Sequence, residues 1–186
     1  MFETQRFIIR PYMLNDAKSL FSVMNTENIY RTTYGIPYPC TVHYARNWIK
    51  AVMRNAVGNK SLEYAVIRKS DNQYMGNIGL INIDFPNKKC DISYFIRPDC
   101  QNNGIATEVS AKMIEIAFTK LQMNRVGGTC MAHNQASARV MEKLKMCYEG
   151  LSRNCMIKED TVVSLKMYSI LKEEYFAYCT GNERLK

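Results

Sequence analysis

A predicted strand, a short polar turn and a predicted helix follow one another between residues 91 and 121, and this succession constrains the fold most. Ile92, Tyr94 and Ile96 occupy alternate positions, which is the period of a pleated strand. Pro98 ends the strand, because proline has no amide hydrogen and restricts the residue before it. The helix that follows would gather its apolar residues on one face, namely Ala106, Val109, Met113, Ile116 and Ala117.

The turn between this strand and this helix has the composition of an anion site. Residues 101–106 read Gln-Asn-Asn-Gly-Ile-Ala. Amides at the start of a helix point outward without partners, and the helix dipole adds partial positive charge there. Gly104 lets the backbone approach a ligand, because it has no Cβ. We therefore expect a phosphate group to bind here; a tight connection that binds nothing is the alternative.

A second strand and helix are predicted downstream. The strand begins at Arg125, and Asn134 stands where the N-cap of the helix is expected. Asparagine is favoured there because its side-chain oxygen accepts a hydrogen bond from an unpaired amide of the first turn. The helix itself carries Val140, Met141 and Leu144 on its apolar side.

In this order and spacing, the segments resemble the GCN5-related N-acetyltransferases (GNAT), and within them the branch that acetylates the N-termini of ribosomal proteins (the RimJ/RimL type). Each matching piece is short, but their combination is specific and covers nearly the whole chain. The pieces are residues 5–11, 15–17, 76–80, 91–96, 101–108, 124–126, 134–137 and 148–150.

The resemblance implies one α/β (α+β) domain over residues 1–186. Its mixed, mostly antiparallel and twisted sheet would have about seven strands, with about four flanking helices and splayed central strands. The sequence pattern places strands at residues 7–10, 63–68, 74–83, 91–96, 125–133, 148–157 and 161–170. It also predicts a helix capped by Asn15, a helix at 42–56, a loop at 29–40 and a frayed tail at 181–186.

Acetyl-CoA is the cofactor that the resemblance implies. The turn at 101–106 would hold its pyrophosphate, and its pantetheine arm would pair with the edge of the strand that ends near Arg97. A backbone amide of that strand would polarise the thioester carbonyl, as in an oxyanion hole. The expected cofactor-binding residues are Phe95, Ile96, Arg97, Gln101, Asn102, Asn103, Gly104, Ile105, Ala106, Thr107, Asn134 and Ser137.

The resemblance also suggests the proton-transfer groups. Asp91 is the candidate general base and would work through a water, because the family commonly has the longer glutamate here. A strand-end aspartate in solvent is an equal alternative, and Glu149 and Glu159 are the next candidates. Ser137 is the candidate acid near the cofactor sulfur, because Met141 replaces the tyrosine of the broad superfamily. Capping of its own helix is the alternative role for Ser137.

Two further regions bear on the acceptor and on one helix end. Tyr30, Tyr34 and Tyr38 either cover the core or, as the resemblance favours, form a wall of the acceptor site. Residues 144–146 read Leu-Lys-Met, where the family usually has Leu-Gly-Phe. Without that glycine the helix must end with Lys145 in a left-handed conformation or in another way.

The composition limits the class of partner and the compartment. The 25 basic and 17 acidic residues give a net charge of +8, which suits an anionic partner. No basic run exceeds Lys88-Lys89, so we expect no DNA-binding patch. The seven cysteines form no C-x-x-C pair and are accompanied by only two histidines. We therefore expect reduced thiols, no metal site, a cytoplasmic location and no membrane segment.

We expect an acetyl-CoA-dependent N-acetyltransferase that passes the acetyl group directly, in a ternary complex, to a primary amine. Cys130 and His133 do not form a nucleophile pair, because both are expected at a strand end. The branch implies a protein N-terminal α-amine, for instance of a ribosomal protein; a polyamine, an amino-sugar antibiotic or another small amine is the alternative. A non-catalytic acyl-CoA sensor and an RNA-binding module are further alternatives. The chain could act as a monomer or a homodimer.

Overall fold

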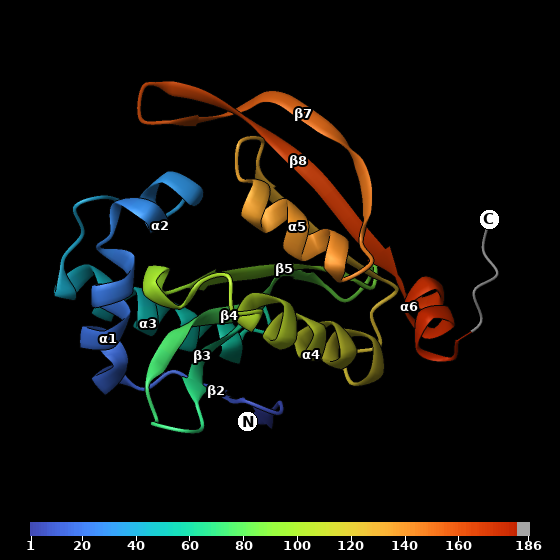
Figure 1. Ribbon diagram of the computed structural model, residues 1–186, viewed down its shortest axis with the longest axis horizontal. Helices are drawn as coiled ribbons and strands as arrows, with labels where there is room; N and C mark the ends of the chain where they lie inside the picture. Colours follow the sequence, from blue (N-terminus) through green and yellow to red (C-terminus); the bar gives the residue numbers. More distant parts are fainter. Residues whose placement is uncertain (182–186) are drawn as a thin grey trace.

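The structure, a computed structural model, describes residues 1–181, and one sheet runs through it (Figure 1). The strands lie in the order β1-β2-β3-β4-β5-β6-β8-β7. Their bounds are β1 Phe2–Glu3, β2 Phe7–Pro11, β3 Leu62–Arg68, β4 Tyr74–Asp84, β5 Lys89–Ile96, β6 Arg125–Met131, β7 Cys147–Lys158 and β8 Thr161–Leu171. The helices are α1 Ala17–Met24, α2 Glu27–Thr32, α3 Val42–Val57, α4 Ile105–Thr119, α5 Gln135–Lys143 and α6 Lys172–Cys179.

β5 and β6 are the only parallel neighbours in the described sheet, and their pairing is short. All other neighbours are antiparallel. The parallel register covers only residues 89–91 of β5 and 125–127 of β6. Beyond it the two strands no longer pair, which leaves the end of β5 without a partner on this side. The predicted mixed sheet with splayed central strands is thus confirmed.

The two faces of β5 pack against different helices. Phe95 belongs to the core cluster that contains Ala45 of α3, whereas Ile92 and Ile96 belong to the cluster that contains Met113 of α4. Side chains alternate along a strand, so the odd-numbered residues of β5 share the α1/α3 face and the even-numbered residues share the α4/α5 face. Figure 1 shows α3 and α4 on opposite sides of the sheet.

The described chain has more elements than the sequence predicts. α2 extends over residues predicted to be a loop at 29–40, so that prediction is wrong for Ile29–Thr32. The Thr26 side chain caps α2 by accepting from the Ile29 amide, and Ile29 is buried in the core. α6 follows β8 directly, and β1 is a two-residue strand paired with β2.

The predicted capping of the first helix by Asn15 is wrong. A 3-10 turn, Leu14–Asp16, precedes α1, and Asp16 holds the N-cap position. The Asp16 carboxylate accepts from the Met13 amide at 2.8 Å and from two Arg10 nitrogens at 2.7 and 2.8 Å. This ion pair with β2 moves the helix start beyond Asn15.

α5 ends at Lys143, and Lys145 supplies the left-handed residue that a glycine usually provides, with φ 61°. The Met146 amide then donates to the Met141 carbonyl at 3.0 Å. The chain therefore keeps the left-handed ending despite the missing glycine. A non-glycine residue in this conformation costs roughly 1–2 kcal/mol.

Only Gly181 of the predicted frayed tail, 181–186, lies within the described residues. Within residues 1–181, no helix has the length and apolar character needed to cross a membrane. The same residues contain no group of three or more His, Cys, Asp or Glu side chains placed to hold a metal ion.

Candidate active site

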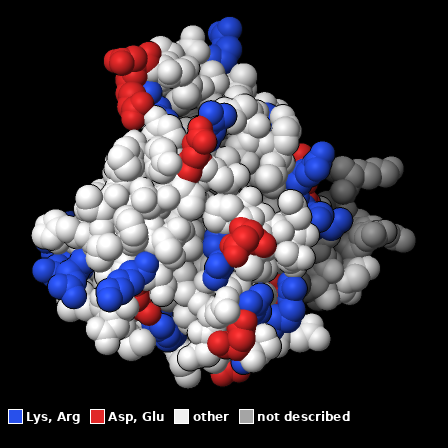
Figure 2. All heavy atoms as spheres, turned by 60° about the vertical axis from the view of Figure 1, so that its left-hand side comes forward, with Lys and Arg blue, Asp and Glu red and all other residues white. Residues whose placement is uncertain are grey.

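A cleft of about 630 Å³ lies where β5 and β6 separate. Its lining combines α2 and the segment after it, α3, strands β3 to β6, the start of α4, and α5. Figure 2 shows acidic and basic side chains scattered over one face of the molecule, with uncharged atoms between them. The charged residues of the lining are Glu63, Asp91, Arg139 and Lys143. Of the predicted cofactor-binding residues, all except Arg97 and Asn103 line the cleft.

The first turn of α4 forms one end of this cleft. Gly104 is the N-cap, in a left-handed conformation with φ 71°, and no side chain of the described residues caps the helix. The first amides of a helix have no partner within it, so those of Ile105, Ala106 and Thr107 are available to an anion. Asn102 is also left-handed, with φ 63°, which tightens the turn before the helix. This arrangement fits a phosphate group.

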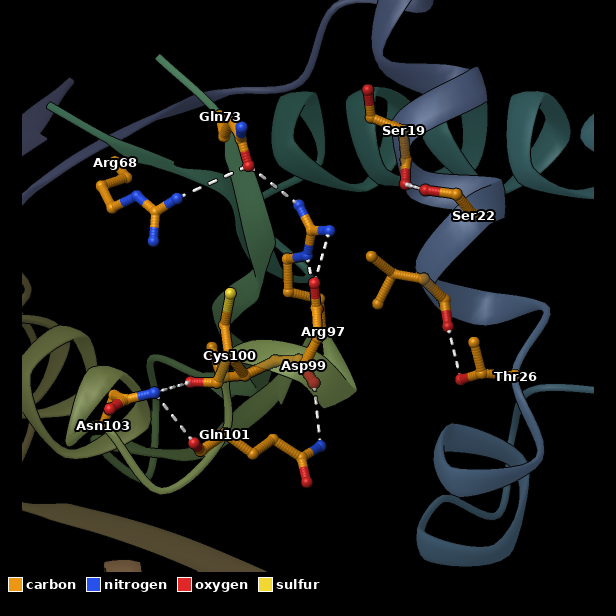
Figure 3. A network of polar contacts seen from close by, with 12 residues as sticks. Ser19, Ser22, Thr26, Arg68, Gln73, Arg97, Asp99, Cys100, Gln101 and Asn103 are labelled. Atoms are coloured by element: carbon orange, nitrogen blue, oxygen red, sulfur yellow. Dashed lines mark hydrogen bonds and ion pairs between the residues drawn. The ribbon is translucent and has the colours of Figure 1, made fainter. Parts of the chain in front are cut away.

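The side-chain amides of the turn hold its shape. Gln101 Nε2 donates to the Ile96 carbonyl and to Asn28 Oδ1 of α2, both at 3.0 Å. Asn103 Nδ2 donates to the carbonyls of Cys100 and Gln101 at 3.2 and 3.1 Å (Figure 3). Gln101 and Asn103 therefore brace the turn from within and leave anion binding to the backbone amides.

Arginines lie on two sides of the turn. Arg6, which precedes β2, donates from Nη1 to the Asn103 carbonyl at 3.0 Å. Arg97 and Arg68 both donate to Gln73 Oε1, at 3.3 and 3.5 Å (Figure 3). Each of these arginines also pairs with a carboxylate: Arg6 with Glu108, Arg68 with Asp71 and Arg97 with Asp99. The affinity of the turn for an anion therefore depends mainly on its uncapped amides.

β5 presents a free backbone edge to the gap. The Arg97 amide donates to the Met75 carbonyl of β4 at 2.9 Å, and by alternation the backbone groups of Phe95 also face β4. Those of Ile92 and Tyr94 consequently face the space left by β6. An extended chain that contains amide groups can pair with this edge like an added strand.

On the α4/α5 face, Tyr94 and Ser137 meet at the gap. Tyr94 Oη lies 2.8 Å from Ser137 Oγ and 3.2 Å from the Ser137 carbonyl. Burial raises the pKa of Tyr94, and the hydrogen bond with Ser137 offsets only part of the rise, so the phenol keeps its proton at neutral pH. The predicted acid Ser137 thus stands beside a second hydroxyl that the sequence pattern did not single out.

Asn134 and Met141 have structural roles in α5. Asn134 Oδ1 accepts from the Ser137 amide at 3.0 Å, which confirms the predicted cap, and Nδ2 donates to the Thr32 carbonyl at 3.3 Å. Met141 is buried, and a Cβ on Gly128 would approach its Cε to 3.2 Å. The residue in the place of the family's tyrosine therefore packs against β6.

Two carboxylates lie on the opposite, α1/α3 face. Asp91 Oδ2 accepts from Asn82 Nδ2 at 2.9 Å, and a Cβ on Gly127 would collide with the other Asp91 oxygen. Glu63 of β3 accepts from Asn77 Nδ2 of β4 at 3.0 Å. Sequence reasoning missed Glu63 and Asn77. The only sequence feature that could have revealed them is that each is a polar residue within a predicted strand.

The other candidate bases, Glu149 and Glu159, do not line the cleft. Glu149 accepts from Arg125 at 2.6 and 2.5 Å and from Ser169 at 2.7 Å. The hydrogen bond with Arg125 lowers the pKa of Glu149 to about 2, which makes it a poor proton acceptor. Glu159 accepts from the Tyr30 hydroxyl at 2.6 Å.

Only one of the three predicted wall tyrosines lines the cleft. Tyr34 does, and its hydroxyl lies 3.4 Å from Thr129 Oγ of β6. The rings of Tyr30 and Tyr38 pack together with 5.8 Å between centroids, outside the lining. Trp48 of α3, which sequence reasoning did not single out, also lines the cleft.

The gap therefore has hydrogen-bond donors on one side and carboxylates on the other. The uncapped amides of α4 and the hydroxyls of Tyr94 and Ser137 lie on one face of the sheet, and the carboxylates of Glu63 and Asp91 lie on the other. Such a site can bind a phosphate-bearing acyl donor from one side and a nucleophile that must lose a proton from the other.

Comparison with known proteins agrees with this geometry. Residues 6–147 match a family model described as an acetyltransferase (GNAT) domain. YoaA of Bacillus subtilis (strain 168), named as an uncharacterized N-acetyltransferase, is 26% identical over 170 residues, which cover 91% of this chain and 96% of YoaA.

Solved structures share the fold at lower identity. RimL, the ribosomal L7/L12 alpha-N-protein acetyltransferase in complex with coenzyme A, gives a TM-score of 0.80 at 17% identity, over 90% of this chain and 95% of RimL. Spermidine N-acetyltransferase from Vibrio cholerae, in complex with CoA and spermine, gives a TM-score of 0.81 at 17% identity, over 93% of this chain and 99% of the spermidine enzyme. Because the family model spans residues 6–147, this chain belongs to the GNAT family of acetyltransferases, whose acetyl donor is acetyl-CoA.

Proposed function

We propose that the chain transfers the acetyl group of acetyl-CoA to a primary amine, the α-amine at a protein N-terminus, by direct transfer in a ternary complex. The observation that carries this proposal is the cleft at the separation of β5 and β6. It joins the uncapped start of α4 on one face of the sheet to carboxylates on the other face. Donor and acceptor can therefore meet in the gap from opposite sides.

On the donor side, the amides of Ile105, Ala106 and Thr107 bind phosphate oxygens. Arg6 Nη2 lies 3.5 Å from the place that a Cβ on Gly104 would take, so it can donate to the same phosphate while Nε stays paired with Glu108. The free backbone groups of Ile92 and Tyr94 hold the amide-bearing arm, and one of their amides polarises the carbonyl that is attacked. Bound acetyl-CoA supplies the acetyl group as a thioester.

Ser137 and Tyr94 act at the sulfur end. Their hydroxyls lie 2.8 Å apart, so one orients the other. A hydroxyl placed here donates a proton or a hydrogen bond to the departing thiolate. On the acceptor side a carboxylate takes the proton of the amine, and Asp91, held by Asn82, is the one that the sequence pattern indicates.

A protein α-amine is supported over a polyamine by charge. Among residues 1–181 the lining contains two acidic residues, Glu63 and Asp91, and the chain carries a net charge of +8. A polycation such as spermidine would need several carboxylates to offset its charges. The likeness to RimL and the sequence match to the RimJ/RimL type point to the same acceptor class.

Thiol release with acetyl-CoA and three amines tests this proposal. We expect turnover with an alanine-started peptide amide, little with spermidine or kanamycin, and none with the N-acetylated peptide. Calorimetry with acetyl-CoA accompanies the assay. Turnover confined to spermidine or kanamycin would assign a small-molecule acceptor. Acetyl-CoA binding without any thiol release would support a sensor, and absence of acetyl-CoA binding would overturn the acetyltransferase proposal.

A further inference from the structure

Glu63 is a carboxylate of the cleft without a cationic partner. No Lys, Arg or His of the described residues forms an ion pair with it. Its one hydrogen bond within residues 1–181 comes from Asn77 Nδ2 at 3.0 Å. A carboxylate withdrawn from water without a cation is unfavourable, and a bound cation removes that cost.

The sheet register directs Glu63 across β4. Glu63 is opposite Gly79 of β4, and Gly79 is opposite Ser93 of β5. Because cross-strand partners point to the same face, Gly79 leaves a notch between Glu63 and β5. A Cβ on Gly79 would come within 2.5 Å of Glu63 Cγ. The Glu63 side chain therefore lies over Gly79 of β4, the strand between β3 and β5.

Asn77 presents a fixed donor to this carboxylate. Its side chain is fully buried, with 0% exposure. Asn77 Oδ1 accepts from Tyr12 Oη at 3.0 Å, and Tyr12 Oη lies 2.8 Å from Tyr74 Oη. Since Oδ1 is engaged by Tyr12, Nδ2 must face Glu63. The network therefore determines the orientation of the Glu63 carboxylate without neutralising it.

The surroundings make Glu63 a better proton acceptor than an ordinary glutamate. Burial raises the pKa of Glu63, and the hydrogen bond from Asn77 offsets only part of the rise. The ionisable groups nearby are the Tyr12 and Tyr74 phenols, whose own pKa values burial raises, and Asp91 across the cleft on β5. The phenols stay neutral over the working range, so Glu63 is the group of this network that can accept a proton.

An aromatic side chain shares the cleft with this carboxylate. Trp48 lines the same cleft, with its ring 5.3 Å from Tyr12 and 6.4 Å from Phe95. Aromatic faces attract cations and cover apolar groups next to them. The acceptor that fits is therefore a single aliphatic ammonium group attached to a small apolar group.

We propose that Glu63, in place of Asp91, binds the ammonium group of the acceptor and accepts its proton, with Asn77 as the positioning residue. This inference rests on the proposed function. One ammonium proton passes to the Glu63 carboxylate, which frees the nitrogen lone pair. The nitrogen forms the N–C bond of the amide as the C–S bond breaks, and a second N–H proton leaves the nitrogen. One proton ends on the sulfur, beside the Ser137 hydroxyl, and the proton on Glu63 returns to solvent.

Trp48 is the only tryptophan of the chain, so its fluorescence reports on this end of the cleft without any turnover. The probe is alaninamide hydrochloride, and its N-acetylated form is the uncharged control. We expect saturable quenching by alaninamide in the wild type and none by the acetylated form. Glu63→Gln should weaken alaninamide binding about 10- to 100-fold, the value of a hydrogen bond between charged groups. Glu63→Asp should restore part of it, and Glu149→Gln, a change at a carboxylate outside the cleft, should leave it within about twofold.

Kinetics separate binding from catalysis. With the peptide amide as acceptor, Glu63→Gln should raise KM and lower kcat. We expect the wild-type rate to fall at acidic pH as Glu63 becomes protonated, and this fall should be absent in Glu63→Gln. Calorimetric affinity for acetyl-CoA should stay within about twofold, because Glu63 lies on the other face of the sheet. Circular dichroism and thermal unfolding check that each variant folds.

Several results would overturn the inference. They are equal alaninamide binding by the wild type and Glu63→Gln, loss of binding in Asp91→Asn alone, or no saturable quenching in the wild type. Alaninamide binding that depends on Glu63 in a chain that does not bind acetyl-CoA would instead overturn the proposed function and leave the ammonium site standing. The two failures are therefore distinguishable.

Discussion

Tyr94 Oη and Ser137 Oγ lie 2.8 Å apart and connect β5 to the first turn of α5 at the gap where β5 has lost its partner strand. The sheet is therefore open to a ligand at this point but still braced by a side-chain contact. Because Tyr94 is an even-numbered residue of β5, the pair faces α4 and α5, away from Glu63 and Asp91. Donors and acceptors of protons are thus kept on separate faces.

The first prediction concerns this hydroxyl pair. Ser137→Ala should lower kcat about tenfold or more, the size expected for loss of a proton donor. Tyr94→Phe should lower kcat less, because it removes the partner that orients Ser137. The double variant should be about as slow as Ser137→Ala, since residues that act as a unit are not additive. Steady-state kinetics check this, with Tyr148→Phe, an exposed tyrosine of β7, as the control. Additive losses would contradict it.

The second prediction concerns the phosphate turn. Gly104→Glu should abolish acetyl-CoA binding, because it places a side chain and a negative charge at the uncapped amides. Gly181→Glu is a matched control: its φ is 69° against 71° at Gly104, and a Cβ there meets none of the described residues within 4 Å. Both variants carry the same backbone strain, so calorimetry isolates the effect on the ligand. Equal affinity in the two variants would rule out this turn as the pyrophosphate site.

The third prediction concerns Glu149 and pH. Its pKa is about 2 in the folded chain, lowered by Arg125, against an ordinary value of 4.5. A group whose pKa is lower in the folded state stabilises the fold above its unfolded pKa, and this stabilisation disappears as pH falls through the folded pKa. Glu149→Gln should therefore be less stable than the wild type above about pH 5, and the difference should shrink between pH 4.5 and 2.

Denaturant unfolding across this range measures the Glu149 effect. The variant should also retain wild-type kcat, because Glu149 does not line the cleft. Loss of kcat with unchanged stability would show that Glu149 serves catalysis after all.

The fourth prediction concerns the β7–β8 hairpin, which reaches toward α2 in Figure 1. Lys158 donates to the carbonyls of Tyr30 and Thr33, the latter at 2.8 Å, and lies over the Tyr30 ring. Lys158→Ala should release α2 and raise the KM of the amine, with little change in acetyl-CoA affinity. Arg153→Ala removes the same charge from an exposed place on β7 and should leave KM unchanged. Equal KM values in both variants would count against a role for this contact.

The fifth prediction concerns the end of α5. Lys145→Gly should raise the free energy of unfolding by about 1 kcal/mol, because glycine adopts the left-handed conformation without strain. For a chain of this size the melting temperature should rise about 2–4 °C. Lys50→Gly, in the exposed middle of α3, should lower stability by about 1 kcal/mol. Calorimetric melting compares the two, and a destabilised Lys145→Gly would disprove this reading of the helix end.

Part of the site could be predicted because its causes are local. The alternation of apolar residues at 91–96 predicted β5, which the structure contains. Asn134 was predicted to cap α5 and does so, and Gly104 stands at the start of α4 as the turn composition indicated. α2 was missed because its six residues carry too few apolar positions to show a helical period. Tyr30 and Tyr38, predicted as walls, pack against each other, and Lys158 of the hairpin lies over the Tyr30 ring. The second contact joins segments far apart in the sequence, which residue spacing does not reveal.

The sequence by itself determined the strand–turn–helix at 91–121 and the family, since both depend on residue order and spacing. Only the tertiary structure decided which side chains share the cleft. Glu63 meets Asn77 because β3 and β4 pair in one register and Gly79 leaves room between them. Tyr94 meets Ser137 because β5 and β6 separate. A shift of one residue in either strand would turn these groups to the other face, and strand register is set by packing across the whole sheet rather than by the residues themselves.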